Sequence, residues 1–543
     1  MNTERQRPPI EITDLPPEEV TPTVLRLLEI CHQQQEQMQV LRDEIARLKG
    51  GNPKPPIKPS KLENQPNESA GSKRPGSGRG KHKRRKTQRL EIHDEIVVPP
   101  ATPLPAGSRF KGTDDFTVRD LVIRAHNTRY RIERWVTPDG ETLRGALPTE
   151  LDSSHFGPTL QAFVLYQYHQ AHVTQPLLHE QLCEWGIEIS AGQLNRLITQ
   201  PAEAFHTEKD ALLRAGLAHS ASVHVDDTGA RHDGRNGFAT HIGNEDFAYF
   251  ASTESKSRIN FLELLRAGDA CYVINDTACV YMRTQGLAQG PLAELTALAP
   301  RSFDSHAAWQ AMLAELGITR ERHVRIATEA VLLGAVIATD INPELVIVSD
   351  DAGQFDVLTH ALCWIHAERG IHKLLGFNDD QRAALAWARD EIWAIYQALK
   401  AYQAEPTPAA RVAIENRFNV LCTTKTCFES LNRALQRLHR NGAELLRALD
   451  RPDIALHNNL SERDIRDYVK KRKISGSTRS AAGRRCRDTF ASLKKTCRKQ
   501  GLSFWRYLRD RVGRQRTLPW LPNLIFGAEQ TAIERAPPAA AKP

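Results

Sequence analysis

Apolar residues recur in steps of three and four between residues 20 and 49, from Val20 through Met38 to Leu48, with Gln, Glu, Arg and Lys between them. This spacing predicts a coiled coil of about four heptads. Gln34 interrupts the apolar seam, at a position that can set register or strand number. An amphipathic helix that packs within its own chain is the alternative, and the coiled coil is favoured because no neighbouring helix is predicted for it.

Residues 51–100 carry little apolar content and are rich in Pro, Gly, Ser and Lys. Such a segment cannot bury a core, so it predicts a basic linker that is disordered alone. The linker is either simply solvated or an arm that binds DNA phosphates. The residues proposed for that contact are Lys83, Arg84, Arg85 and Lys86.

Residues 108–150 alternate between apolar and polar positions in runs at 116–118, 121–123 and 130–132. The turn sequence Thr137-Pro-Asp-Gly140 follows these runs, and together they predict a small β module.

Residues 155–218 have helical periodicity. Within them, residues 176–182 and 191–198 predict two helices, separated by Gly186 and with Ser190 as the cap of the second. This arrangement resembles a DNA-binding helix-turn-helix, but ordinary packing of two helices explains it more often and is favoured.

From residue 220 to 515, short β runs come first and then alternate with helical patterns. This order predicts an α/β domain built around a mixed sheet. Helical patterns are expected at 258–266, 380–402 and 408–449. Residues 516–543 form a C-terminal tail.

The net charge of +8 and the pI of about 9.0 suit a polyanionic partner, although charge alone is weak evidence. The nine cysteines are scattered without a C-x-x-C pair, which is typical of reduced thiols. The N-terminus lacks a signal peptide, and residues 330–338, the most apolar segment, are too short to span a bilayer. We therefore expect a cytoplasmic protein, associated with the nucleoid and without a membrane partner.

Two aspartates follow apolar runs: Asp226 comes after Ser222-Val-His-Val225, and Asp350 comes after Leu345-Val-Ile-Val-Ser349. Carboxylates at the ends of neighbouring strands are the oxygen ligands that Mg²⁺ prefers, and two such ions can catalyse phosphoryl transfer. A turn or helix cap is the alternative role for each aspartate. Each belongs to a doublet, with Asp227 and Asp351, and the first member is preferred because it sits directly on the predicted strand end.

A third carboxylate, Glu462, opens a probable helix in which Asn459, Glu462 and Arg466 share one face. A plain surface pair between Glu462 and Arg466 is the alternative. The residues that follow are strongly basic, which fits a site that grips DNA backbone. The proposed phosphate contacts are Lys470, Lys471, Arg472, Lys473, Arg484 and Arg485.

Three blocks of sequence resemble the transposases of the insertion sequence 66 family. They are Val225-Asp-Asp-Thr228; Ser349-Asp-Asp-Ala-Gly-Gln-Phe355 with Leu362-Cys-Trp-Ile-His-Ala-Glu-Arg369; and Asn458-Asn-Leu-Ser-Glu-Arg-Asp-Ile-Arg466. The supporting residues in these blocks are Cys363, Trp364, His366, Arg369, Asn459, Arg463 and Arg466. The resemblance covers about residues 150–515, and the predicted coiled coil also looks like that of the family.

The resemblance implies a ribonuclease H-like catalytic domain in which Asp226, Asp350 and Glu462 form an acidic triad that holds two Mg²⁺ ions, with Mn²⁺ as an alternative. The spacings of 124 and 112 residues require helical insertions, near 276–340 and 376–450. Asp276 competes with Asp350 for the second position, and Asp350 is preferred because the Cys-Trp-x-His block follows it.

Zinc is not expected, because no cysteine occurs from residue 32 to 182, where family members often carry a cysteine-based module. Cys363 and His366 have a ligand-like spacing, but two ligands do not make a structural zinc site. Packing around Trp364 is the preferred role for Cys363.

The predicted function is a transposase that cleaves transposon ends and joins them to target DNA. The partners implied are double-stranded DNA at terminal inverted repeats and at the target, a second copy held through the coiled coil, and accessory proteins of the same element. A ribonuclease H-like nuclease without strand transfer and a decayed DNA-binding regulator are the alternatives.

Overall fold

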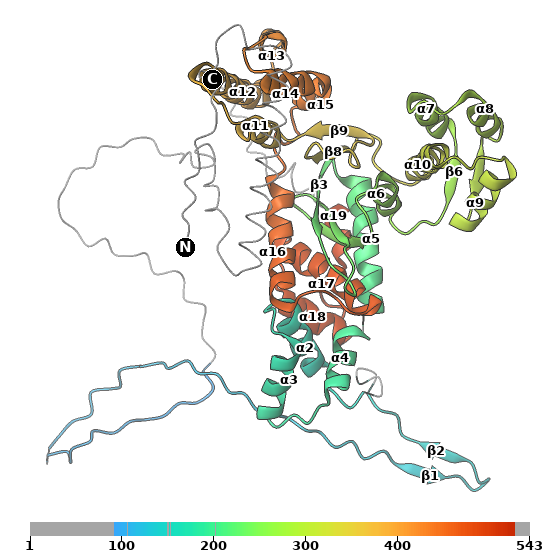
Figure 1. Cartoon of the computed structure of the whole chain (residues 1–543). Coiled ribbons are helices and arrows are strands. Elements are labelled where there is room, and N and C mark those ends of the chain that lie inside the picture. Colours follow the sequence, from blue (N-terminus) through green and yellow to red (C-terminus); the bar gives the residue numbers. More distant parts are fainter. Residues whose placement is uncertain (1–91, 106, 149–150, 152–153, 201, 527–543) are drawn as a thin grey trace, which may run out of the picture. The chain divides into compact units, whose positions relative to one another are not determined.

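The computed structural model describes residues 92–105, 107–148, 151, 154–200 and 202–526 (Figure 1). The chain divides into two units, residues 1–122 and 123–543. The described residues of the first unit form no helix or strand. The predicted coiled coil and Lys83 to Lys86 lie outside the described residues. Within the described part, no helix combines the length and apolar character needed to cross a membrane.

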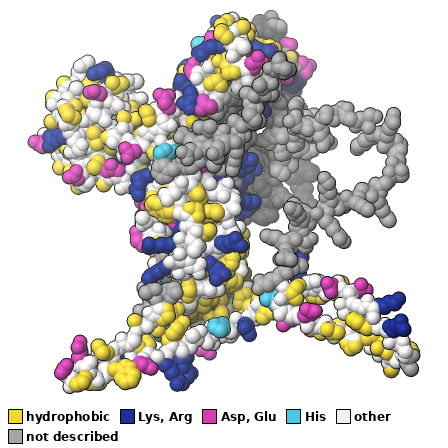
Figure 2. Space-filling view, turned by 180° about the vertical axis from the view of Figure 1, so that it is seen from behind, with side chains coloured by type: hydrophobic (Ala, Val, Ile, Leu, Met, Phe, Trp, Pro, Cys, Tyr) yellow, Lys and Arg dark blue, Asp and Glu magenta, His cyan; other side chains and the backbone are white. Residues whose placement is uncertain are grey.

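The second unit begins with a hairpin of β1 (Arg134–Val136) and β2 (Thr142–Arg144) around the predicted turn at Thr137 to Gly140. The strands predicted at 116–118, 121–123 and 130–132 do not form, so the β module is reduced to this hairpin. Its side chains have no layer to pack against, and Trp135 and Val136 stay exposed. Hydrophobic side chains of this region are visible on the surface low in Figure 2.

Four helices follow: α2 (Pro158–His169), α3 (Gln175–Glu184), α4 (Ala191–Thr199) and α5 (Glu203–His219). The first three share a small core that includes Val164, Leu178 and Leu194. Ser190 caps α4 as predicted, because its hydroxyl accepts from the Gln193 backbone while the Gln193 side chain accepts from the Ser190 backbone.

Five strands form the central mixed sheet, in the order β5-β4-β3-β8-β9. They are β3 (Ser222–Gly229), β4 (Phe238–Gly243), β5 (Ala248–Thr253), β8 (Val346–Ser349) and β9 (Thr359–Leu362). β3, β4 and β5 pair antiparallel, whereas β8 and β9 run parallel to β3. The predicted mixed α/β class is confirmed at this level.

Helices cover both faces of the sheet. On one face, Val223, Val225 and Tyr249 join the main core with residues of α5. On the other, Ala239 and Phe250 pack against Ile465 and Tyr468 of α16 (Asn459–Ser475). The remaining C-terminal helices, α17 (Ala481–Lys499), α18 (Phe504–Val512) and α19 (Leu521–Phe526), close the main core. Successive residues of a strand point to opposite faces, so each strand contributes to both cores.

Two long segments interrupt the sheet. The first, between β5 and β8, contains α6 (Arg258–Leu265), β6 (Tyr272–Ile274), α7 (Asp276–Thr284), α8 (Gln289–Ala297), β7 (Arg301–Phe303), α9 (His306–Glu315) and α10 (Glu321–Ala338). It is not purely helical, because β6 and β7 pair antiparallel. Asp276, the competitor for the second carboxylate, begins α7, where Asn275 is the cap.

The second segment, between β9 and α16, is helical. It contains α11 (Trp364–His372), α12 (Asp379–Ala404), α13 (Pro408–Thr423), α14 (Glu429–Arg440), α15 (Gly442–Leu445) and the short 3-10 helix η4 (Arg447–Leu449). The helical pattern expected over 408–449 is divided into several helices, and Thr426 bonds the side chain of Asn432 in the break between α13 and α14. This segment has its own core, which reaches the sheet at Val346 and Val348.

Candidate functional site

Asp226 and Asp350 occupy matching positions on neighbouring strands. β3 and β8 pair in parallel from Ser222 opposite Val346 to His224 opposite Val348, and two residues further on stand Asp226 and Asp350. The prediction that Asp226 follows the end of its strand is wrong, because the ladder with β4 continues through both aspartates to Gly229. Only the pairing of β3 with β8 stops before the aspartates. Asp226 and Asp350 therefore lie at the point where these two strands are no longer hydrogen-bonded to each other.

The alternation of β3 turns Asp226 toward α16. The side chains on either side of it on the same face, His224 and Thr228, bond to Asn458 and Arg472 respectively. Asp227 points to the opposite face, where it pairs with Lys256 and accepts a hydrogen bond from Gln354 at 2.9 Å. The two members of this doublet therefore have different surroundings.

The second doublet divides in the same way. Asp351 pairs with Arg437 of α14 at 2.6 Å. Asp350 accepts a hydrogen bond from the backbone of Ala352 at 3.2 Å, and its charge acts on Asp226 and on His366. These contacts favour Asp350 over Asp351 as the member that faces Asp226.

Asn458, the fully buried residue before α16, joins the helix to the sheet. Its amide donates to the carbonyl of Val225 at 2.7 Å, and its side-chain oxygen accepts from His224 at 3.1 Å. Its backbone N–H donates to the sulfur of Cys363 at 3.2 Å. One side chain thus fixes the start of α16 beside Asp226 and beside the start of α11.

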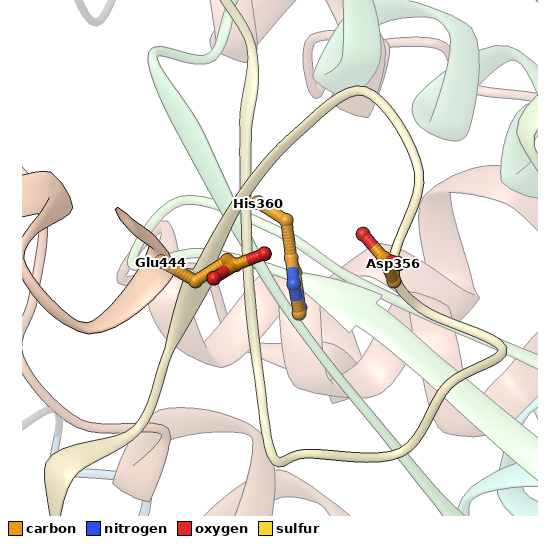
Figure 3. Close-up of side chains that lie close together, drawn as sticks. All are labelled: Asp356, His360 and Glu444. Atoms are coloured by element: carbon orange, nitrogen blue, oxygen red, sulfur yellow. The ribbon is translucent and has the colours of Figure 1, made fainter. Parts of the chain in front are cut away.

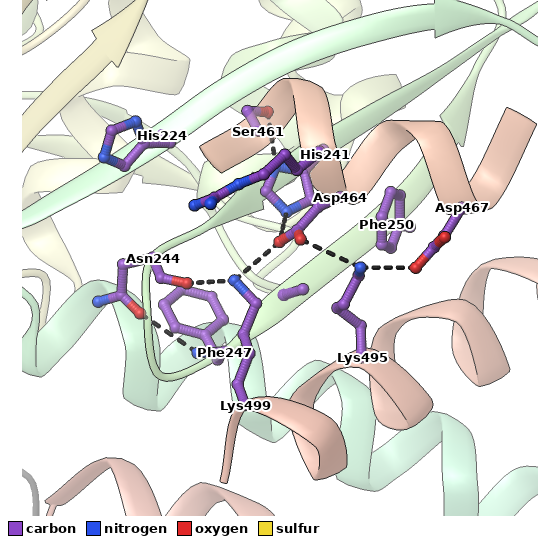
Figure 4. Close-up of polar contacts among 12 residues, drawn as sticks. His224, His241, Asn244, Phe247, Phe250, Ser461, Asp464, Asp467, Lys495 and Lys499 are labelled. Carbon is purple, nitrogen blue, oxygen red and sulfur yellow. Dashed lines mark hydrogen bonds and ion pairs between the residues drawn. The ribbon is translucent and has the colours of Figure 1, made fainter. Parts of the chain in front are cut away.

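A buried polar network fixes the next turns of α16 (Figure 4). His241 of β4 lies 2.7 Å from the Ser461 hydroxyl and 3.2 Å from Asp464. Asp464 also pairs with Lys499 at 2.7 Å and with Lys495 at 3.3 Å. Burial acts to raise the pKa of Asp464, but the hydrogen bond from His241 and the charge of Lys499 outweigh it, so the pKa lies well below its usual range.

Glu462 stands between these anchored residues on the open side of the helix, with its side chain 18% exposed. One of its oxygens lies 3.1 Å from Arg369 and 3.4 Å from His366, and the other lies 3.7 Å from Arg466. The expected pair with Arg466 is therefore present, but the contacts with α11 show that Glu462 is more than a surface residue.

The charges of the neighbouring carboxylates act on Asp226. Burial, together with the negative charges of Asp350, Asp227 and Glu462, raises the pKa of Asp226 to about 7. An all-oxygen set of carboxylates that repel one another is the donor chemistry that suits a hard divalent cation such as Mg²⁺. The residues present therefore fit that group.

In the described part of the chain, the group of three His, Asp and Glu side chains whose ligand atoms all lie within 4.8 Å is a different one, Asp356, His360 and Glu444 (Figure 3). The ligand atoms of Asp226, Asp350 and Glu462 do not all lie within that distance, and the carboxylate of Glu462 is paired with Arg369 and His366.

The Cys-Trp-x-His block is structural in part. Cys363 and Trp364 are buried, and the indole N–H of Trp364 donates to the carbonyl of Leu445 at 2.8 Å. His366 differs, because its pKa is lowered by burial while the charges of Glu462 and Asp350 act to raise it. It lies beside the carboxylates and was predicted only as part of a motif.

The predicted basic residues have different surroundings. Lys470, Lys473 and Arg485 are exposed, and Arg485 pairs with Glu203 at 3.1 Å. Lys471 is buried, donates to the carbonyl of Tyr168 at 2.8 Å and lies over its ring. Burial, with the charges of Arg487 and Lys494, lowers the pKa of Lys471 to about 7. Lys471 is thus occupied inside the protein.

Two more motif residues lie on the open side of α16. Arg463 has a side chain that is 64% exposed and lies 4.0 Å from Glu245, and Asn459 is the first residue of the helix. Sequence reasoning missed His224, His241 and Asp464, which position α16. Their positions on strands and a helix gave no indication of partners more than 200 residues away.

Comparisons with known proteins identify the family of the chain. The family model described as Transposase IS66 family matches residues 153–285 and 346–485, about half of the chain. An uncharacterised protein of Sinorhizobium fredii, y4jO, is 44% identical over 304 residues, which are 56% of this chain and 95% of the relative. The unmatched residues 286–345 hold α8, β7, α9 and α10 of the first long segment. The two matched segments contain Asp226, Asp350 and Glu462, and the chain belongs to the IS66 family of transposases.

Proposed function

We propose that this transposase cleaves the ends of its transposon and joins them to target DNA, with Asp226, Asp350 and Glu462 as a catalytic triad. The observation that carries the proposal is the matching position of Asp226 in β3 and Asp350 directly after β8, with Glu462 on the helix that Asn458 fixes beside Asp226. The strand order, with three antiparallel strands followed by two parallel ones, supports a ribonuclease H-like fold.

The three carboxylates would hold two Mg²⁺ ions, or Mn²⁺ in their place. When bound, such ions supply Lewis-acid stabilisation of the attacking and leaving oxygens of a phosphodiester. The protein's own contribution is to hold the acidic side chains at rigid positions. Asp226 is fixed by backbone pairing with β4, Asp350 directly follows the paired strand β8, and Glu462 is fixed by the anchoring of α16.

Arg369 and His366 pair with the carboxylate of Glu462. Because the side chain of Arg369 is 44% exposed, it can turn toward solvent or toward a DNA phosphate and free the carboxylate. Glu462 would then complete the triad only when DNA is bound, and the site would stay inactive until then.

Binding of DNA would use cations outside this pocket. Lys470, Lys473, Arg472 and Arg484 lie on or just after the helix that carries Glu462, so phosphates held there would run past the carboxylates. Residues 83–86, the helix pair α3 and α4 and the predicted coiled coil would add contacts to the inverted repeats and hold two copies together. Lys471, which is buried, is left out of this set.

The test is cleavage of labelled transposon-end DNA by the full chain with Mg²⁺. Glu462→Gln keeps the shape of the side chain and removes its charge, so cleavage should fall about 10³-fold or more, while binding of end DNA is retained. Glu405→Gln, an exposed residue just after α12, is the matched control and should cleave normally. Normal cleavage by Glu462→Gln would remove Glu462 from the triad.

Two alternatives give different results in the same system. A nuclease without strand transfer would cut the ends but leave precut ends unjoined to a target plasmid. A DNA-binding regulator would bind the ends with no dependence on a divalent cation and would not cut them.

A further inference from the structure

Asp356, His360 and Glu444 come together beside the second carboxylate of the triad (Figure 3). Asp356 lies in the loop between β8 and β9, His360 lies in β9, and Glu444 lies in α15. Each offers one ligand atom, and these atoms all lie within 4.8 Å of one another. Figure 3 shows the ring of His360 between the two carboxylates.

The hydrogen bonds of His360 define its protonation. The Ser349 hydroxyl donates to the carbonyl of Asp350 at 2.5 Å, so its oxygen accepts from Nε2–H of His360 at 2.7 Å. Nδ1 then carries a lone pair, and no hydrogen bond to it is found among the described residues. Metal-bound histidines typically donate their other ring N–H in this way.

The ligand atoms of the cluster are only partly engaged by other residues. Within the described contacts, His360 forms no ion pair with Asp356 or Glu444, and a buried oxygen of Glu444 has no hydrogen-bond partner. Arg258 pairs with Asp356 at 3.7 Å, on a side chain that is largely exposed. Arg447 donates to the carbonyl of His360 and pairs with Asp450. Two carboxylates and an imidazole therefore lie within ligand distance of one another, and a buried oxygen of Glu444 has no partner of its own.

We propose that these three side chains bind a divalent transition-metal ion, such as Zn²⁺ or Mn²⁺, separately from the catalytic triad. A set of one imidazole nitrogen and two carboxylates favours such an ion over Mg²⁺, which prefers oxygen ligands alone. The ion would tie the loop after Asp350 and β9 to α15 of the second long segment. Its role would be to hold the edge strand β9 and the loop that follows Asp350, rather than to take part in the triad.

The experiment uses the full chain carrying Asp226→Asn and Glu462→Gln, so that the triad no longer binds cations. After removal of metals with a chelator, Co²⁺ is added as a probe because its visible absorption reports a nitrogen ligand. We expect about one Co²⁺ per chain, displaced by Zn²⁺ but not by excess Mg²⁺. Absence of Co²⁺ binding by the folded protein would overturn the proposal.

Two further variants in this background test the ligands. Glu444→Gln and Asp356→Asn keep the shape of the side chains, and each should weaken Co²⁺ binding at least about tenfold, since loss of even outer-shell partners has that effect. Asp379→Asn, whose side chain is 97% exposed, is the matched control and should bind as the background does. Asp356 is also largely exposed, so a folding defect is not expected there. Equal binding by both variants and the control would overturn the proposal.

Discussion

Helix α16 has two faces that are held in different ways. The inner face carries Ser461, Asp464 and Ile465, which are buried. Ser461 contacts His241 of β4, Asp464 pairs with Lys495 of α17, and Ile465 packs in a core cluster with residues of β4 and β5. The open face carries Glu462 and Arg466, with side chains that are 18% and 71% exposed. The side chains of Ser461 and Glu462, which are adjacent in the chain, therefore differ in how tightly they are held. The comparison indicates that the inner face sets where the helix lies, and the open face supplies the chemistry.

The same division applies to β3 and provides the prediction with the largest expected effect. Asp226 faces α16, whereas Asp227 is held by Lys256 and Gln354 on the other face. Asp226→Asn should lower cleavage of transposon ends about 10³-fold or more, because it removes a triad carboxylate. Asp227→Asn should lower it far less. Cleavage rates of the two proteins at saturating Mg²⁺ are the measurement, and an equal loss would erase the distinction between the faces.

The inner face of α16 should be needed for stability. Asp464→Asn leaves Lys499 and Lys495 without their shared partner in a buried setting, so the free energy of unfolding should fall by about 3 kcal/mol or more. Urea denaturation of the full chain followed by circular dichroism measures this. Asp467→Asn is a graded comparison, since the Asp467 side chain is 26% exposed and should cost less. A loss in Asp464→Asn no greater than in Asp467→Asn would show that the network does not anchor the helix.

Acid should weaken the same network. The pKa of Asp464 is depressed in the folded protein, so its contribution is present above the unfolded value of about 4 and is lost as pH falls toward the folded value. Native protein should therefore lose stability below about pH 4, and Asp464→Asn should lose less over that range. Thermal unfolding midpoints at several pH values test this, and parallel curves for the two proteins would contradict it.

The open side of the site should also weaken in acid, but at a higher pH than the buried network. Because the pKa of Asp226 is raised to about 7, a cation that binds there must displace its proton. Mg²⁺ affinity should rise up to about tenfold per pH unit below pH 7 and level off above it. Calorimetry in buffers with different ionisation enthalpies should detect the proton released. The dependence should disappear in Asp226→Asn, and its survival there would assign it to another group.

The smallest expected effect separates two neighbouring lysines of α16. Lys473→Ala, on the exposed side, should reduce the salt dependence of DNA binding by about one unit of slope. Lys471→Met should leave that slope unchanged, because the Lys471 ammonium is engaged with Tyr168 inside the protein. Fluorescence anisotropy with end DNA at several salt concentrations is the measurement. A reduced slope in Lys471→Met would mean that this lysine reaches DNA after all.

The candidate carboxylates could be named from sequence, because each follows a β run or belongs to a motif block. The residues that position them could not be predicted. Asn458 binds the backbone of Val225 across 233 residues, and no spacing rule anticipates such a contact. Strand β9 was missed because only its pairing with β8 distinguishes Thr359–Leu362 from a loop. Lys471 was grouped with exposed cations because charge patterns do not show which side of a helix is covered.

The parallel pairing of β3 with β8 has a consequence for the order in which the protein acquires activity. The two strands are separated by more than 100 residues, and Asn458, which fixes α16, comes later still. Contacts of such long range form late and after costly chain closure. On the proposed function, a chain that is still on the ribosome carries an incomplete catalytic site, since Glu462 is synthesised more than 100 residues after Asp350. Synthesis itself would then delay the first cut until all three carboxylates have been made.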